Sequence, residues 1–125
     1  MSKKLKLSEA EQEIMMIIWE EGRPLTSNFI LDHITSRTLA LSTVMTVLAR
    51  LCEKGFVCCD RTTRINYYSA AVGQEEYLEE ASHEFLKRMH NNSIASMITA
   101  LNRKGAISED DIGELRRMLD HLDHH

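Results

Sequence analysis

The chain of 125 residues has few aromatic residues and only one proline, and no apolar run in it approaches the about 20 residues that a transmembrane helix needs. Its basic start, Met-Ser-Lys-Lys-Leu-Lys, leads into a segment that carries Glu11, Glu13, Glu20 and Glu21 rather than into the apolar stretch of a signal peptide. An ordinary share of hydrophobic and charged residues is typical of a soluble globular protein. We therefore expect a cytoplasmic protein that does not insert into a membrane.

Cysteines are also few, and their arrangement excludes two classes of small protein. Cys52, Cys58 and Cys59 form an odd set without C-x-x-C spacing, which argues against a disulfide framework and against a zinc knuckle. Cys58 and Cys59 are neighbours on a predicted strand and point to opposite faces, so they do not readily share one ligand. Reduced thiols are expected, with one cysteine of that pair in the core and the other exposed.

Catalytic and metal-binding patterns are scarce as well. The chain lacks G-x-S-x-G, a phosphate-binding loop and H-E-x-x-H, so we expect neither an enzyme nor a bound cofactor. His121 and His125 are four residues apart, with His124 beside them, which is a spacing that suits a divalent metal on a helix. A frayed chain end is the favoured interpretation, so no metal site is predicted.

Negative charge is concentrated in the second half of the chain. Residues 1–70 carry nine Lys and Arg against eight Asp and Glu, whereas residues 71–125 carry six against eleven. The two halves have formal charges of +1 and −5, which make up the total of −4. A nearly neutral first half with a local basic face is compatible with binding to nucleic acid.

Capping signals and apolar spacing predict the first helix. Ser8 and Glu11 have the spacing of a capping box, and apolar residues follow at helical spacing until Gly22. We expect this helix at about residues 9–21. Trp19 lies near its end among core residues, so it is interpreted as a packing residue rather than a ligand platform.

Two more helices are expected before residue 56. Thr26 is the next cap and starts a short second helix, and a third helix runs from Leu41 to Gly55. The predicted buried face of the third helix consists of Leu41, Val44, Leu48 and Leu51. Its opposite face carries Ser42, Thr43, Met45, Thr46, Ala49 and Arg50.

After Gly55 the pattern changes to two β-prone runs, residues 56–59 and 65–68, separated by the polar segment 60–64. Three helices followed by a hairpin are typical of a winged helix-turn-helix domain, which we place at residues 1–72. The fold class is therefore mainly α, with a small β-hairpin wing.

In such a fold the third helix enters the major groove of DNA and the wing approaches the backbone. The predicted base contacts are Ser42, Thr43, Met45 and Thr46. The predicted phosphate contacts are Arg50, Lys54, Arg61 and Arg64. Hydroxyl and methyl groups read bases less selectively than an arginine that binds guanine.

The second half, residues 73–125, reads as helices with apolar stripes, interrupted at Asn91-Asn92 and capped again at Ser108. So few residues in short helices do not enclose a core, and a second copy of the segment is the simplest cover. We predict a helical dimerisation region. Its contact residues are Leu78, Phe85, Met89, Ile94, Met97, Ile98, Leu101, Ile112, Leu115 and Leu119.

Four stretches in this order resemble one known family: LSEAEQEIMMIIWEEG at 7–22, VLARLCEKGFV at 47–57, NYYSA at 66–70 and ISEDDIGELRRMLD at 107–120. The family is the penicillinase-repressor group of bacterial transcriptional repressors, also called BlaI/MecI/CopY. The resemblance implies a homodimer that binds an inverted-repeat operator. In relatives that control β-lactam resistance, a membrane sensor protease triggers cleavage of the repressor, and in copper-responsive relatives metal binding releases the DNA.

This sequence departs from the family pattern in three places. Ala40-Leu41 replaces the usual Ser-Pro at the start of the recognition helix, and Ser42 and Met45 occupy two usually basic positions. The Asn-Phe cleavage point of β-lactam relatives falls near Ser93-Ile94. The C-terminal cysteine cluster of the copper branch is missing.

We therefore predict a homodimeric transcriptional repressor of the winged-helix class, released by a signal that the sequence does not name. The predicted partners are double-stranded operator DNA, a second copy of the chain and, for release by cleavage, a membrane sensor protease. Two alternatives stay open. One is a metal- or redox-responsive repressor of the same fold, and the other is a winged-helix module that binds proteins through its acidic helices.

Overall fold

A computed structural model describes residues 6–123 of the chain, and its first helix, α1 (Glu9–Glu21), has the predicted bounds. The Ser8 hydroxyl accepts a hydrogen bond from the Glu11 amide at 3.2 Å, and the Glu11 carboxylate accepts one from the Ser8 amide at 2.8 Å. Gly22 adopts a left-handed conformation, with φ of 64°, and its amide donates to the Ile18 carbonyl. The predicted capping box and glycine stop are thus confirmed.

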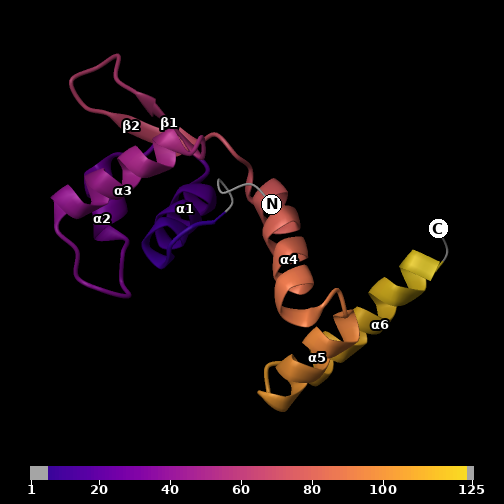
Figure 1. Cartoon of the computed structure of the whole chain (residues 1–125). Coiled ribbons are helices and arrows are strands. Elements are labelled where there is room, and N and C mark those ends of the chain that lie inside the picture. The colour runs from indigo at the N-terminus through magenta and orange to yellow at the C-terminus, as the bar shows by residue number, and fades with distance from the viewer. Residues whose placement is uncertain (1–5, 124–125) are drawn as a thin grey trace. The chain divides into compact units, whose positions relative to one another are not determined.

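Two further helices follow, α2 (Ser27–Asp32) and α3 (Leu41–Glu53). The Thr26 side chain caps α2, as predicted. Helix α3 ends at Glu53 with Lys54 as its C-cap, and the next residue, Gly55, has a φ of 84°, which explains why a glycine stands there. Figure 1 shows α1, α2 and α3 gathered together, with the hairpin extending from them.

The hairpin consists of β1 (Val57–Asp60) and β2 (Tyr67–Ala70), which pair antiparallel. Both strands lie slightly later in the chain than the predicted runs. The reason at the first strand is Phe56, whose amide donates to the Leu51 carbonyl to close α3 and whose side chain is buried. Phe56 therefore belongs to the end of the helix and to the core rather than to the sheet.

The core of the first compact unit, which ends at Ser82, includes the start of helix α4 (Gln74–His90). The Trp19 indole N–H donates to the Val72 carbonyl at 2.8 Å, and the Tyr77 ring lies 5.4 Å from the Trp19 ring and 5.8 Å from the Phe56 ring. The interpretation of Trp19 as a packing residue is confirmed. The predicted division of roles between residues 1–72 and 73–125 stays a prediction. The buried apolar residues are Ile14, Met15, Ile18, Leu25, Ile30, Val44, Val47, Leu48, Leu51, Phe56, Val57, Tyr68 and Tyr77.

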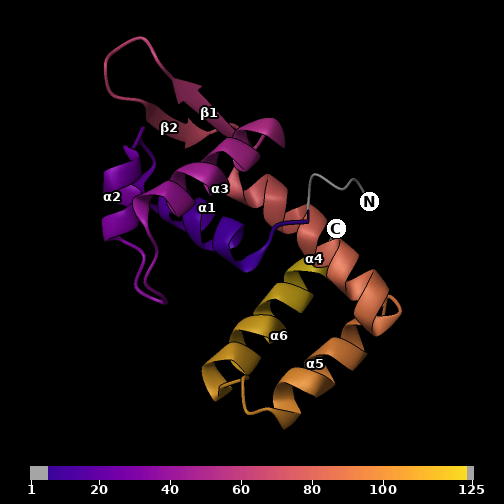
Figure 2. The same cartoon turned by 60° about the vertical axis from the view of Figure 1, so that its left-hand side comes forward.

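The second unit begins at His83 and contains the rest of α4 with α5 (Ile94–Arg103) and α6 (Glu109–Asp123). Figure 2 shows these three helices following one another. The predicted interruption occurs at Asn91 and Asn92, which are both left-handed. No residue between 83 and 123 is buried. Among the helices of residues 6–123, none combines the length and the apolar character of a membrane span.

Candidate nucleic-acid interface

Helix α3 presents an exposed face made of the residues that the sequence predicts as base contacts. Ser42, Thr43, Met45 and Thr46 are all exposed. The Thr46 hydroxyl donates to the Ser42 carbonyl at 2.9 Å, so its hydrogen is used within the helix and its oxygen remains able to accept a hydrogen bond. The Met45 side chain is 45% exposed, although methionine is usually a core residue. This face combines small polar groups with one flexible apolar side chain.

The wing loop between β1 and β2 has a shape fixed by its own side chains. An Asp60 carboxylate oxygen accepts hydrogen bonds from the Thr62 amide at 2.9 Å and the Thr62 hydroxyl at 2.7 Å, which lower the pKa of Asp60. The Thr63 hydroxyl donates to the Ile65 carbonyl at 2.8 Å. These bonds hold an Asx-type turn at the tip.

Both wing arginines project from this loop. Arg61 and Arg64 are exposed, and neither forms a hydrogen bond or an ion pair with the residues at 6–123. The Arg50 side chain on α3 is exposed too, and its guanidinium group forms no hydrogen bond or ion pair with these residues. Three of the four predicted phosphate contacts thus offer guanidinium groups that are not engaged elsewhere in the described chain.

Lys54, the fourth predicted phosphate contact, already has a partner within the protein. Its Nζ lies 2.8 Å from each carboxylate oxygen of Glu11 and donates to the Lys6 carbonyl at 3.1 Å. Burial alone would raise the pKa of Glu11, but hydrogen bonds from Lys54 and Ser8 outweigh it and hold this pKa below its usual value. The structure therefore groups Lys54 with α1 rather than with the two wing arginines.

Some exposed residues near this surface were not singled out from the sequence. Ile65 is 55% exposed at the wing, and Tyr67 is also exposed. Both fall in a run that the sequence assigns to a strand, where alternate residues are expected to be buried. The polar segment 60–64, which directly precedes Ile65, is the sequence feature that could have indicated that Ile65 lies in the wing loop and not in the strand.

The cysteines remain free thiols, as predicted. Cys58 is exposed and Cys59 is half-buried against the core, so the two do point to different environments. Burial raises the pKa of the Cys52 thiol, which lowers its thiolate fraction and its reactivity. Within the described part of the chain, no three His, Cys, Asp or Glu residues are grouped as metal ligands.

The second unit contains an apolar groove of about 540 Å³ between α5 and α6. Five of the predicted dimer contacts line it, namely Ile94, Ile98, Ile112, Leu115 and Leu119. Ile107, which the sequence analysis did not single out, lines it too. Of the other predicted contacts, Leu78 belongs to the first unit, whereas Phe85, Met89, Met97 and Leu101 belong to the second and lie outside the lining.

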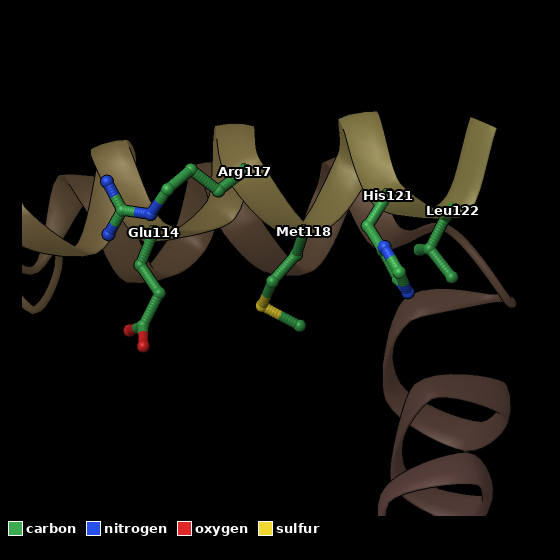
Figure 3. A pocket seen from close by; sticks show the side chains of 5 residues that line it. All are labelled: Glu114, Arg117, Met118, His121 and Leu122. Carbon is green, nitrogen blue, oxygen red and sulfur yellow. The ribbon is translucent and has the colours of Figure 1, made fainter. Parts of the chain in front are cut away.

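A second hollow, of about 370 Å³, lies along α6. Figure 3 shows the side chains of Glu114, Met118, His121 and Leu122 pointing to the same side of this helix. Met118 and Leu122 are more than half exposed. Helix α6 therefore presents apolar side chains on more than one face. His124 and His125, which the sequence analysis weighed with His121 as metal ligands, lie outside the described residues.

Three helices followed by a short hairpin define a winged helix-turn-helix protein, in which the third helix has a polar exposed face and the hairpin loop is basic. The sequence model of the family described as "Penicillinase repressor" matches residues 7–121. The penicillinase repressor of Bacillus licheniformis is 30% identical over 120 residues, which cover 96% of this chain and 94% of that protein. The chain belongs to the penicillinase repressor family, a family of DNA-binding transcriptional repressors.

Other relatives agree with this assignment. The methicillin resistance regulatory protein MecI of Mammaliicoccus sciuri is 28% identical over 118 residues, covering 94% of this chain and 96% of that protein. The solution structure of the DNA-binding domain of the repressor BlaI is similar with a TM-score of 0.52 at 27% identity, covering 62% of this chain and 94% of that one. BlaI from Bacillus licheniformis in complex with the blaP half-operator has a TM-score of 0.50, with the same identity and coverage. The predicted fold class and family are thus confirmed.

Proposed function

We propose that this chain is a homodimeric repressor that binds an inverted-repeat operator. The observation that carries the proposal is the exposed polar face of α3 beside a wing whose arginines form no hydrogen bond or ion pair within the described chain. In winged-helix proteins these two elements meet the major groove and the phosphate backbone. The relative BlaI, whose structure was solved in complex with a half-operator, supports the proposal that this chain binds operator DNA.

Base contacts are assigned to Ser42, Thr43, Met45 and Thr46, and phosphate contacts to Arg50, Arg61 and Arg64. Threonine and serine hydroxyls bond to several bases, and the Met45 side chain suits contact with a thymine methyl group. Sequence preference should therefore be moderate at each position. Most of the affinity should come from the phosphates and fall steeply with salt.

The proposal of a homodimer is based on the exposed apolar surface of the second unit. Its groove is apolar and open, and no residue of 83–123 is buried. An interface that pairs this surface with itself by a twofold axis would cover the same side chains on both copies. Two winged helices held in this way match the two halves of an inverted repeat.

The test measures binding of the full chain to three duplexes by fluorescence anisotropy, using DNA from upstream of its own gene. The duplexes carry an intact inverted repeat, one half-site, or the repeat with its half-sites scrambled. We expect the intact repeat to bind at least tenfold more tightly than the scrambled one and to show a steep salt dependence. Equal binding to all three would contradict operator recognition. No binding at low salt would instead favour the protein-binding alternative.

For release of the DNA, the turn between α4 and α5 is the proposed point of cleavage. It contains the exposed residues Asn91 and Asn92 and leads into Ser93, which caps α5. A cut there would separate α4 from both helices that line the groove. The test adds a matching membrane sensor protease to the repressor bound to its operator and follows fragment size and anisotropy together. Loss of binding on addition of copper, zinc or a peroxide to an intact chain would instead support the metal or redox alternative.

A further inference from the structure

The end of helix α3 is fixed to the start of α1 by one buried charge. The Glu11 side chain is only 3% exposed, and the Lys54 Nζ lies 2.8 Å from both of its oxygens. Lys54 donates a hydrogen bond to Oε1, whereas Oε2 has no hydrogen bond and is held by the charge alone. The same ammonium donates to the Lys6 carbonyl, so three segments of the chain meet at this nitrogen.

A buried carboxylate without a paired cation destabilises the folded protein, because the loss of hydration is not compensated by an ion pair. Glu11 also completes the capping box of α1 through the Ser8 amide. Movement of Lys54 away from Glu11 would therefore leave a buried charge unpaired at a helix start. The pair is a strong restraint on where α3 ends relative to α1.

The beginning of α3 is restrained less firmly, by contacts of the loop before it. The Ser36 hydroxyl donates to Glu13 at 2.6 Å, and Arg37 pairs with Glu9 and Glu13 at 3.5 Å. Glu9, Ser36 and Arg37 are exposed and Glu13 is half-buried, and ion pairs that remain open to water contribute little. Ala40, the N-cap residue of α3, makes no side-chain cap at all. The buried pair at the other end is thus the stronger polar anchor of this helix.

We propose that Lys54 is a positioning residue of the operator interface, which acts through Glu11 to hold α3 at the angle needed for base contact and does not itself bind a phosphate. This inference rests on the proposed function. Base contacts depend on the placement of Ser42, Thr43 and Thr46 to within a fraction of an ångström. A helix that is fixed before binding loses less freedom when the contacts form.

Two consequences separate this role from a phosphate contact. A phosphate contact contributes to counterion release, so its loss lowers the slope of log K against log salt by about one unit. Loss of a positioning residue weakens binding without changing that slope. In addition, breaking the pair from the Glu11 side frees the Lys54 ammonium, which would preserve or strengthen a phosphate contact but weaken a positioned helix.

The experiment compares Glu11→Gln, Lys54→Met, the double variant and Arg50→Met, each as a full chain binding the inverted repeat over a range of salt. Glu11→Gln keeps the shape of the side chain and an oxygen for the Ser8 amide. We expect Glu11→Gln and Lys54→Met each to lower affinity about tenfold with an unchanged salt slope. The double variant should bind as weakly as either single one, because both remove the same pair. Arg50→Met is the matched control on the same helix, and its slope should fall by about one unit.

All measurements are made at a temperature where Trp19 fluorescence reports a fully folded first unit for every variant. Unchanged affinity for Glu11→Gln would overturn the inference, since the pair would then be merely structural. A slope reduced by one unit in Lys54→Met would overturn it as well, since Lys54 would be a phosphate contact. If Lys54→Met does not fold, Glu11→Gln alone decides. A wild-type chain that binds no duplex would overturn the proposed function itself, and the inference with it.

Discussion

The two units of this chain contain similar kinds of apolar side chain but use them differently. In the first unit, apolar side chains from α1, α2, α3 and the hairpin are enclosed around one core. In the second unit, the same residue types remain at the surface of α5 and α6, and none is buried. A side chain left in water contributes little to folding, so the first unit supplies its own stability, whereas the second is the unit for which we propose a partner surface.

Helix α4 illustrates the contrast within one element. Near its start, Tyr77 is buried between the rings of Trp19 and Phe56. Farther along, Phe85 and Met89 are exposed. The difference between the units therefore arises from what covers each face of a helix and not from its composition.

The largest effect is expected from a charge in the groove of the second unit. In a symmetric dimer, Leu119→Asp would bury one carboxylate from each subunit. We expect the dissociation constant of the dimer to rise by at least about 1,000-fold. Sedimentation analysis over a concentration series measures this change. Met16→Asp is the matched control, because Met16 is also exposed but belongs to the first unit. Dissociation by the control as well would break the contrast between the units.

The next effect compares two leucines that differ in burial. Leu48→Ala removes a fully buried side chain and should lower the free energy of unfolding of the first unit by about 3 kcal/mol. Leu101→Ala removes a side chain that is exposed in the second unit. It should lower the free energy of unfolding of the first unit by less than about 0.5 kcal/mol. Urea unfolding followed by fluorescence of Trp19, the single tryptophan of the chain, measures the first unit selectively. Equal losses would mean that the two units unfold as one.

A smaller effect concerns which unit meets the DNA. Arg61→Met and Arg64→Met should each lower the salt slope of operator binding by about one unit and weaken binding several-fold at low salt. Lys104→Met, at the end of α5, should leave the slope unchanged because it lies in the second unit. Anisotropy titrations at four or more salt concentrations give the slopes. A reduced slope for Lys104→Met would show that DNA contact extends beyond the first unit.

The smallest effect is a response of each unit to acid. The pKa of Glu11 is lowered in the folded chain, so its stabilisation is present above the unfolded value and is lost as the pH falls through the folded value. Glu11→Gln should therefore reduce the acid sensitivity of Trp19-detected unfolding below about pH 4.5. Hydrogen bonds from Ser108 lower the pKa of Asp111 in the same direction, but Asp111→Asn should not affect this signal, since α6 lies in the second unit. Equal pH profiles for Glu11→Gln and the wild type would contradict the role of the pair.

Local signals predicted the elements of this fold well. The capping box at Ser8 and the left-handed Gly22 set the bounds of α1 because both act within a few residues. The start of β1 was predicted too early, since the burial of Phe56 depends on tertiary packing. Whether residues 1–72 and 73–125 have separate roles stays a prediction, although Tyr77 contacts residues that are far away in the sequence.

The candidate interface was foreseen where exposure follows from helical spacing. The outward positions of α3 and the basic wing tip needed no knowledge of distant contacts. Lys54 is the opposite case, because its partner Glu11 is 43 residues away and no local pattern links them. The DNA contacts themselves stay a prediction that the titrations above will test.

The wing loop has a consequence for redirecting this protein to other DNA sites. Its turn is fixed by bonds among Asp60, Thr62, Thr63 and the Ile65 carbonyl, and none of these involves a guanidinium group. The hydrogen bonds that fix the loop therefore do not depend on the side chains of Arg61 and Arg64. A library that varies only these two positions would sample new binding preferences while the scaffold beneath stays constant.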